Sequence, residues 1–139
     1  MKKIMLLLLA CMLLVSCSKK EVKQTTQESK TASEAFSVAE KIKNAFVKKD
    51  LATIQKNTTE SGFRDITKGK QVFDSADITF TPRWVEIEGD QMLVNISWKS
   101  AWLLSGRKMD ERGMAVFVME GNPLKVTRII RANPFVLQQ

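Results

Sequence analysis

The chain has 139 residues, enough for one domain with its own hydrophobic core and too few for two domains of ordinary size. Its 22 basic and 15 acidic residues give a formal net charge of +7. This charge favours binding to nucleic acid only if the protein is located in a compartment that contains nucleic acid. It has no histidine, no tyrosine and two cysteines, which argues against a zinc site and leaves carboxylates or lysines with shifted pKa values for acid–base catalysis.

The first 16 residues are typical of a secretory signal peptide. Lys2 and Lys3 provide a positive start, and residues 4–15 form an uninterrupted apolar run of 12 residues. A membrane-spanning helix needs roughly 20 apolar residues to cross the hydrocarbon core. The length of the run therefore favours a signal peptide over an uncleaved membrane helix.

The residues that end this run, Leu14, Val15, Ser16 and Cys17, resemble the lipobox of bacterial lipoproteins. The resemblance implies cleavage between Ser16 and Cys17, a diacylglycerol thioether on Cys17, and, in many bacteria, acylation of the new amino terminus. The only other cysteine, Cys11, lies inside the apolar run, so a disulfide is a poor alternative. Two or more acyl chains hold a protein on a membrane stably, whereas one holds it only marginally.

Cleavage would lower the formal charge from +7 to +5 by removing Lys2 and Lys3. The remaining positive charge then suits an anionic membrane surface rather than nucleic acid. Residues 17–30 are predicted to be the lipidated cysteine and a flexible tether, in which Val22 is the only apolar residue. Ser18 after the cysteine resembles the enterobacterial pattern for outer-membrane delivery, so we expect a lipid-anchored envelope protein that faces the periplasm.

Order is expected to begin at residue 31, because Thr31 and Glu34 have the spacing of a capping box. Asp50 is the predicted N-cap of a second short helix, and a third is expected to stop at Gly69. The first helix carries one apolar stripe that should face the core. The stripe consists of Ala35, Val38, Ala39, Ile42, Ala45 and Phe46.

Beyond residue 72 the apolar period changes from 3.6 to 2, which predicts strands. Ile78 and Phe80 occupy even positions, whereas Val85 and Ile87 occupy odd ones, so the inward face changes phase between them. Pro82 lies in this gap. Because proline cannot donate to a strand ladder, we predict a β-bulge over residues 81–83 of an edge strand.

The rest of the sequence predicts an antiparallel meander. Gly89 and Asp90 form a two-residue hairpin signal, and the next strand keeps even phase from Met92 to Leu104. Residues 105–113 form a predicted polar connection, and residues 114–119 and 124–131 the last two strands. Helices followed by such a meander predict an α+β domain with N-terminal helices packed on a curved antiparallel sheet.

Two segments resemble the nuclear transport factor 2-like superfamily of cone-shaped α+β domains. They are "AFVKKDLATI" (residues 45–54), like its helix, charged turn and Asp-capped second helix, and "GMAVFVMEGNPLKVTRII" (residues 113–130), like its last hairpin. The resemblance implies one such domain over residues 31–139. It also implies that a site would lie in a pocket between helices and sheet, where catalytic members use Asp, Tyr or His side chains.

Three tryptophans are candidates for binding a small apolar ligand. Trp98 and Trp102 share a phase on the long predicted strand, and Trp84 follows the predicted bulge. If their face lines the mouth of the cone, the indoles form an apolar pocket for a lipid-like or ring-shaped ligand. The alternative is that these large side chains close the core of a small domain.

Asp65, Asp77 and Glu86 are the candidate acid–base carboxylates, and the alternative is that they are solvated or cap-forming. No pair has a spacing that singles it out, and the chain has no Asp-rich calcium loop or glycine-rich phosphate loop. We therefore expect no catalytic residue, cofactor or metal.

The sequence favours a lipid-anchored envelope protein that is not an enzyme and that binds a small apolar ligand or an envelope protein. Its expected contacts are with the membrane through the anchor, and not with nucleic acid or metal. A structural accessory subunit of an envelope complex is a second hypothesis. An isomerase or dehydratase of the kind found in the superfamily is a third.

Overall fold

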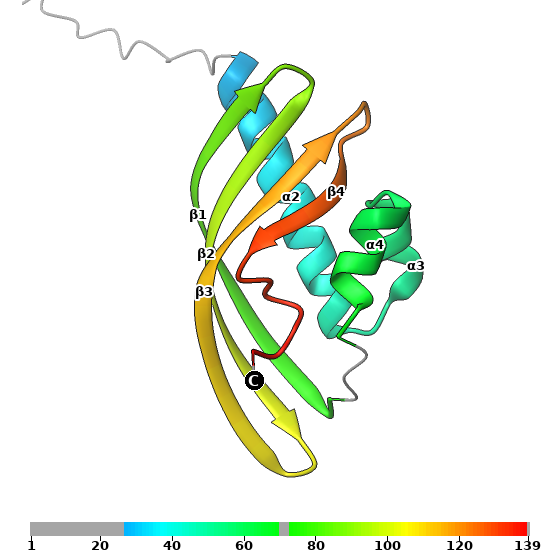
Figure 1. Cartoon of the computed structure of the whole chain (residues 1–139), viewed down its shortest axis with the longest axis vertical. Coiled ribbons are helices and arrows are strands. Elements are labelled where there is room, and N and C mark those ends of the chain that lie inside the picture. The colour runs from blue at the N-terminus through cyan, green and yellow to red at the C-terminus, as the bar shows by residue number, and fades with distance from the viewer. Residues whose placement is uncertain (1–26, 70–72, 139) are drawn as a thin grey trace, which may run out of the picture.

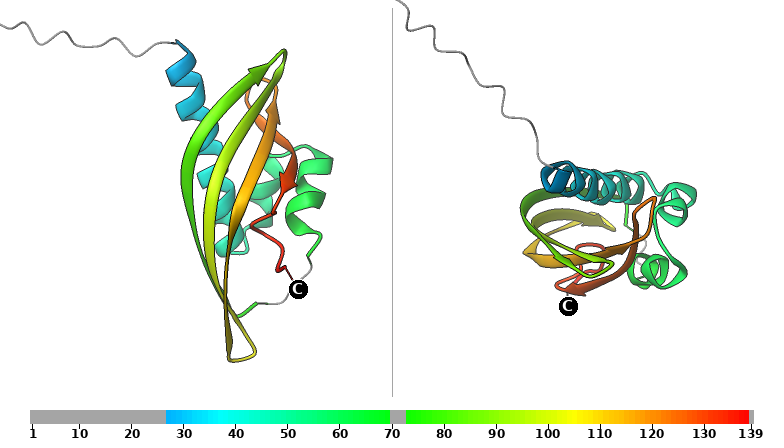
Figure 2. Two further views of the ribbon diagram at one scale, coloured as in Figure 1. Left: turned by 60° about the vertical axis from the view of Figure 1, so that its left-hand side comes forward. Right: turned by 90° about the horizontal axis from the view of Figure 1, so that it is seen from above.

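The computed structural model describes residues 27–69 and 73–138. The elements are α2 (Gln27–Val47), α3 (Leu51–Lys56), α4 (Glu60–Thr67), β1 (Ser75–Glu88), β2 (Gln91–Leu104), β3 (Arg107–Glu120) and β4 (Lys125–Arg131). The strands form one antiparallel sheet in the order β1-β2-β3-β4. The sheet curves around the helices, with α2 on its concave face and α3 and α4 beside β4 (Figure 1, Figure 2). The predicted α+β fold is confirmed, and the predicted signal peptide, Ser16 and Cys17 lie outside the described residues.

The first helix starts earlier than predicted. The hydroxyl of Thr31 donates a hydrogen bond of 2.9 Å to the carbonyl oxygen of Gln27, one helical turn before it. The predicted capping box of Thr31 and Glu34 was therefore wrong, and residues 27–30 belong to α2 rather than to the tether. The predicted apolar stripe does face the core, with Val38 and Phe46 partly buried and its other residues buried. Its buried members are Ala35, Ala39, Ile42 and Ala45.

The N-caps of the two short helices follow from side chains that accept backbone hydrogen bonds. Asp50 accepts from the Thr53 amide at 3.1 Å and from the Thr53 hydroxyl at 2.6 Å, which confirms the predicted cap of α3. These hydrogen bonds stabilise the carboxylate and lower the pKa of Asp50 below its usual value. Thr59 caps α4 by accepting from the Gly62 amide at 3.3 Å.

The predicted irregularity of β1 is confirmed. The pairing of β1 with β2 shifts between Pro82 and Trp84, on an edge strand of the sheet. Before the shift Phe80 points into the core, and after it Val85 packs against the core. The bulge therefore reverses which positions of β1 face the helices. Ile87, which was predicted to face inward, is exposed.

The hairpin from β1 to β2 turns at Gly89, whose φ of +58° explains the glycine there. The even positions of β2 are buried as predicted, from Met92 to Trp102. The predicted polar connection over residues 105–113 was wrong beyond its first two residues. The turn consists of Ser105 and Gly106, and β3 begins at Arg107, because residues 107–113 pair with residues 98–104 of β2.

The chain after β4 closes the open end of the core, which the sequence did not predict. Phe135 is almost fully buried, with its ring 4.8 Å from that of Phe46 and 6.1 Å from that of Phe117. The Asn133 side chain donates to the Asp65 carbonyl oxygen at 2.8 Å and accepts from the Phe135 amide at 2.9 Å. These bonds hold the C-terminal segment against α4 and place an aromatic ring between helix α2 and the sheet.

Candidate functional site

Two of the three candidate tryptophans are covered by neighbouring side chains. Trp98 is 2% exposed, and its indole N–H donates to the Ala132 carbonyl oxygen at 2.9 Å. Trp102 is 1% exposed, meets Phe46 and Phe73 edge to face, and donates to the Ser100 hydroxyl at 3.0 Å. Both indoles have the packing and the satisfied N–H group of core residues.

The third tryptophan lies on the opposite face of the sheet. Trp84 comes directly after the register shift, one position before the inward-facing Val85, so its side chain points away from the helices. It is 48% exposed, and its indole N–H donates to the Glu86 carboxylate at 2.7 Å. The structure therefore does not bring the three indoles together.

Trp84 is part of an apolar surface on the outer face of the sheet, which we call the apolar band. One cross-strand row runs from Trp84 through Asn95 and Val116 to Ile130, so all four strands contribute. The rows on either side add apolar residues of the same face. The band consists of Trp84, Leu93, Met114, Val116, Val118 and Ile130.

The apolar band is exposed at both ends of its central row. Trp84 is 48% and Ile130 40% exposed, whereas Val116 and Val118 are buried, although neither belongs to the hydrophobic core cluster. Large exposed apolar side chains on one face of a domain, here Trp84 and Ile130 at the two ends of one row, mark a candidate interaction surface. Sequence reasoning missed this surface, although the phase change at Pro82 already indicated that Trp84 points outward.

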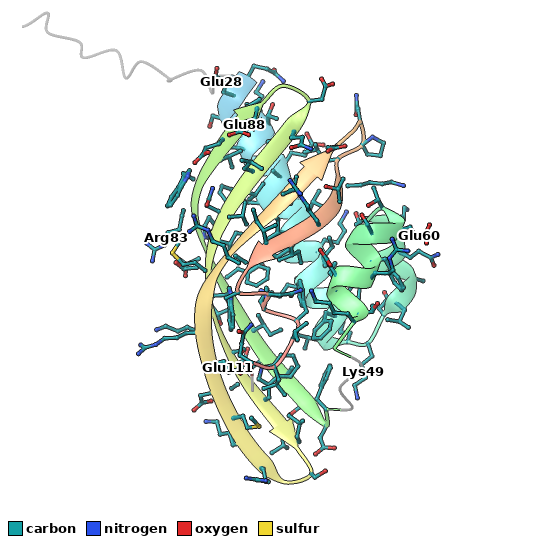
Figure 3. The ribbon with its side chains drawn as sticks, in the orientation of Figure 1. Glu28, Lys49, Glu60, Arg83, Glu88 and Glu111 are labelled. Carbon is teal, nitrogen blue, oxygen red and sulfur yellow. The ribbon has the colours of Figure 1, made fainter. Side chains whose placement is uncertain are left out.

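Charged side chains border the band along the strands. On one side lie Arg83, Lys99 and Arg112, of which Arg83 is fixed by a hydrogen bond of 2.8 Å from its Nε to the Ser97 hydroxyl. Figure 3 shows Arg83 projecting from the sheet on the side away from the helices. On the other side lies Glu86, which accepts from the Trp84 indole. An apolar centre with a charged border has the composition of a protein-binding surface.

The three candidate carboxylates have different surroundings. Asp65 accepts from the Ile129 amide at 2.9 Å and thereby ties α4 to β4. Glu86 holds the Trp84 indole, and Asp77 lies on the outer face of β1, where its side chain is exposed. The structure does not bring Asp65, Asp77 and Glu86 together.

Another carboxylate, which sequence reasoning placed in a polar loop, points inward from β3. Glu111 accepts from the Gln138 amide at 2.8 Å through Oε1, while its Oε2 is buried and has no hydrogen-bond partner among the described residues.

Within residues 27–69 and 73–138, no three His, Cys, Asp or Glu side chains converge as a metal site requires. None of the described helices is long and apolar enough to cross a membrane.

Comparison with known proteins supports the fold. No protein-family model and no curated protein matches the chain. Among solved structures, it is similar to a "Nuclear transport factor 2 (NTF2-like) superfamily protein from Salmonella enterica subsp. enterica serovar Typhimurium str. LT2". The TM-score is 0.65 at 13% identity, over 77% of this chain and 93% of that one. At this identity the likeness shows the fold, which is NTF2-like.

Proposed function

We propose that this NTF2-like chain is a lipid-anchored, non-catalytic protein of the bacterial envelope that binds another envelope protein. Its anchor is the lipid on Cys17, and its location is the outer membrane, facing the periplasm. The observation that carries the binding role is the apolar band on the outer face of the sheet. The anchor is supported by the apolar run and the lipobox-like residues that end it.

A protein partner is favoured over a small apolar ligand by the positions of the tryptophans. Trp98 and Trp102 are almost fully buried, so a ligand that reached their indoles would have to displace packed neighbours, such as Phe46 and Phe73 around Trp102. Trp84, in contrast, is 48% exposed without any rearrangement. Binding that needs no displacement of packed side chains avoids that cost in free energy.

The apolar band has the features of a binding surface in energetic terms as well. Fully burying a large apolar side chain contributes about 1.5–3 kcal/mol, and Trp84 and Ile130 retain much of that surface. Tryptophan and arginine are the residue types that most often dominate binding energy at interfaces. Here Trp84 and Arg83 are neighbours in β1. A structural accessory subunit of a complex would use the same surface.

An isomerase or dehydratase role has less support. General acid–base catalysis needs groups that reach one substrate together. Asp65, Asp77 and Glu86 lie in separate surroundings, and Asp65 is already used to join α4 to β4. We therefore place the enzymatic alternative behind the binding role.

Lipid anchoring is tested by expressing the full chain in a bacterium and measuring the mass and membrane association of the product. We expect a lipidated protein that begins at Cys17 and stays in the membrane fraction in high salt. Cys17→Ser should lose the lipid and the processing, whereas Cys11→Ser, which changes the other cysteine, should keep both. An unmodified protein released from membranes by salt alone would refute the anchor.

Partner binding is tested by photo-crosslinking in intact cells, with a benzophenone amino acid placed at Ile130 of the apolar band. We expect one adduct of defined mass with an envelope protein, and its loss when Trp84→Ala is introduced into the same chain. A probe at Lys56, on the exposed face of α3, is the matched control and should give no such adduct. A stable protein that gives equal, diffuse labelling from both positions would refute the proposed surface.

A further inference from the structure

A groove beside the apolar band carries opposite charges at its two ends. It lies on the outer face of the sheet, where Asp77 of β1, Lys99 of β2 and Arg112 of β3 are among the residues that line it, and it has a volume of about 490 Å³. Strands β1, β2 and β3 each contribute one residue to each of two neighbouring cross-strand rows. One row is Thr79, Lys99 and Arg112, and the next is Asp77, Ala101 and Asp110.

The first row concentrates positive charge. Lys99 and Arg112 are directly opposite each other on β2 and β3, where side chains start about 5 Å apart. Like charges in this position destabilise a sheet, and neither side chain has an ion pair or side-chain hydrogen bond within residues 27–69 and 73–138. A second groove, which shares Lys99 and Arg112, adds Arg83 to the same region. An anion bound here would relieve the repulsion.

The second row provides negative charge one step along the strands. Asp77 and Asp110 are two residues from Thr79 and Arg112, a spacing of about 7 Å along a strand. Ala101 lies between the two carboxylates, and its small side chain leaves the floor of the groove open. Asp110 has Lys108 at 3.8 Å, but both side chains are about 70% exposed, so this ion pair is weak.

We propose that this groove binds a small zwitterion that carries a phosphate group and an ammonium group. The phosphate lies between Lys99 and Arg112, because a guanidinium and an ammonium together recognise phosphate oxygens by charge-assisted hydrogen bonds. The ammonium group lies between Asp77 and Asp110. This inference goes beyond the proposed function, because it assigns a small ligand and uses neither the lipid anchor nor the residues of the apolar band, although Lys99 and Arg112 also border that band.

Phosphoethanolamine has this chemistry, and it occurs both as a free compound and as the headgroup of a phospholipid. The two sources differ in that the free compound is a phosphomonoester and the headgroup a phosphodiester. The alternative to a site is a solvated face on which the two charged rows neutralise each other. That alternative predicts no affinity for either compound beyond that of the separate charges.

The test is calorimetric titration of the processed full chain, produced in bacteria and kept in dodecyl maltoside, a detergent without phosphate. The ligands are O-phosphoethanolamine and glycerophosphoethanolamine, and the reference ligands are inorganic phosphate and ethanolamine. We expect at least one zwitterion to bind ten-fold or more tightly than either reference ligand. Tighter binding of the monoester would indicate the free compound, and equal or tighter binding of the diester the headgroup.

Charge-removing variants decide which residues are responsible. Lys99→Gln with Arg112→Gln should weaken zwitterion binding at least ten-fold. Asp77→Asn with Asp110→Asn should reduce the affinity for the zwitterion to that for phosphate alone. Because these side chains are exposed and outside the core, circular dichroism should show that the variants remain folded.

The matched control removes the same positive charge from the helices. Lys56→Gln on α3 and Arg64→Gln on α4 should leave zwitterion binding unchanged, because these helices lie far from the groove. Figure 3 shows Glu60, the ion-pair partner of Arg64, on the opposite side of the molecule from Arg83. The proposal is overturned if inorganic phosphate binds as tightly as the zwitterions. It is also overturned if neither zwitterion binds, or if the Lys99 and Arg112 double variant binds like the unchanged chain.

Discussion

Replacing Gly62 with alanine tests how closely α4 is held against β4. Gly62 is buried, and a Cβ atom at this position would collide with the backbone carbonyl oxygen of Val126. The same carbonyl accepts from the Thr59 amide at 2.9 Å, and Thr58 pairs with Val126 in a parallel bridge. Because the obstacle is backbone held by these bonds, no side-chain rotation can relieve the collision.

The size of the effect follows from two opposing contributions. Alanine is favoured over glycine inside a helix by about 1 kcal/mol. Forcing an extra carbon into a packed site costs typically about 1–3 kcal/mol, and a backbone obstacle places Gly62→Ala at the upper end of that range. We therefore expect a net destabilisation of about 2 kcal/mol. For a domain of roughly 110 residues, whose unfolding entropy is about 0.23 kcal/mol/K, that lowers Tm by roughly 9 °C.

The assay is thermal and urea unfolding followed by far-ultraviolet circular dichroism. Gly69→Ala is the matched control, because its Cβ would meet the Phe135 carbonyl oxygen and a Val136 methyl group at 3.5 Å, an ordinary contact distance. We expect the control to change stability by less than about 0.5 kcal/mol. If Gly62→Ala were as stable as Gly69→Ala, α4 would not be held against β4 as the structure shows.

Trp98→Ala should cost about 3–5 kcal/mol, as large-to-small core substitutions do, whereas the exposed Trp84→Ala should cost less than about 1 kcal/mol. If the two variants lost the same free energy of unfolding in urea, the assignment of Trp98 and Trp84 to opposite faces of the sheet would be contradicted. Asn133→Ala should destabilise the domain by about 1–3 kcal/mol, because it leaves the buried Phe135 amide and the part-buried Asp65 carbonyl oxygen without these hydrogen bonds. Early protease cleavage of the C-terminal segment is the readout. Hydrogen bonds from Thr53 lower the pKa of Asp50 below its ordinary value of 3.8. The Asp50 carboxylate therefore stabilises the fold fully at pH values above 3.8, and this stabilisation is lost as the pH falls through the lowered pKa. Between pH 5 and 2, urea unfolding should therefore show that acid lowers the free energy of unfolding less in Asp50→Asn than in the unchanged chain. If both proteins had the same pH profile, the role of the cap would be contradicted.

Features that depend on neighbouring residues were predictable from the sequence. Pro82 cannot donate to a ladder, and the apolar phase changes around it, so the bulge could be predicted from a few residues. The Asp50 cap depends on a side chain that reaches an amide three residues ahead, and the hairpin depends on Gly89 adopting a positive φ. These are local constraints that act before any tertiary contact forms.

The errors lie where a local signal competes with pairing elsewhere in the chain. Residues 107–113 are charged and read as a loop, but their backbone groups pair with β2, and their outward side chains need no burial. Thr31 has the spacing of a cap, but its hydroxyl bonds back to Gln27 inside a longer helix. The C-terminal segment has little periodicity, so its buried Phe135 was visible only in the folded chain.

The period of apolar residues along the chain predicted that helices precede strands, and it predicted the inward positions of α2 and β2, but not the inward Glu111 of β3. Which residues become neighbours across strands depends on how the whole chain folds. The position of Lys99 opposite Arg112 and of Trp84 in one row with Ile130 depends on the turns and the bulge together, since each sets the register of the strand that follows. The candidate site consists of such cross-strand neighbours, which periodicity along one strand does not report.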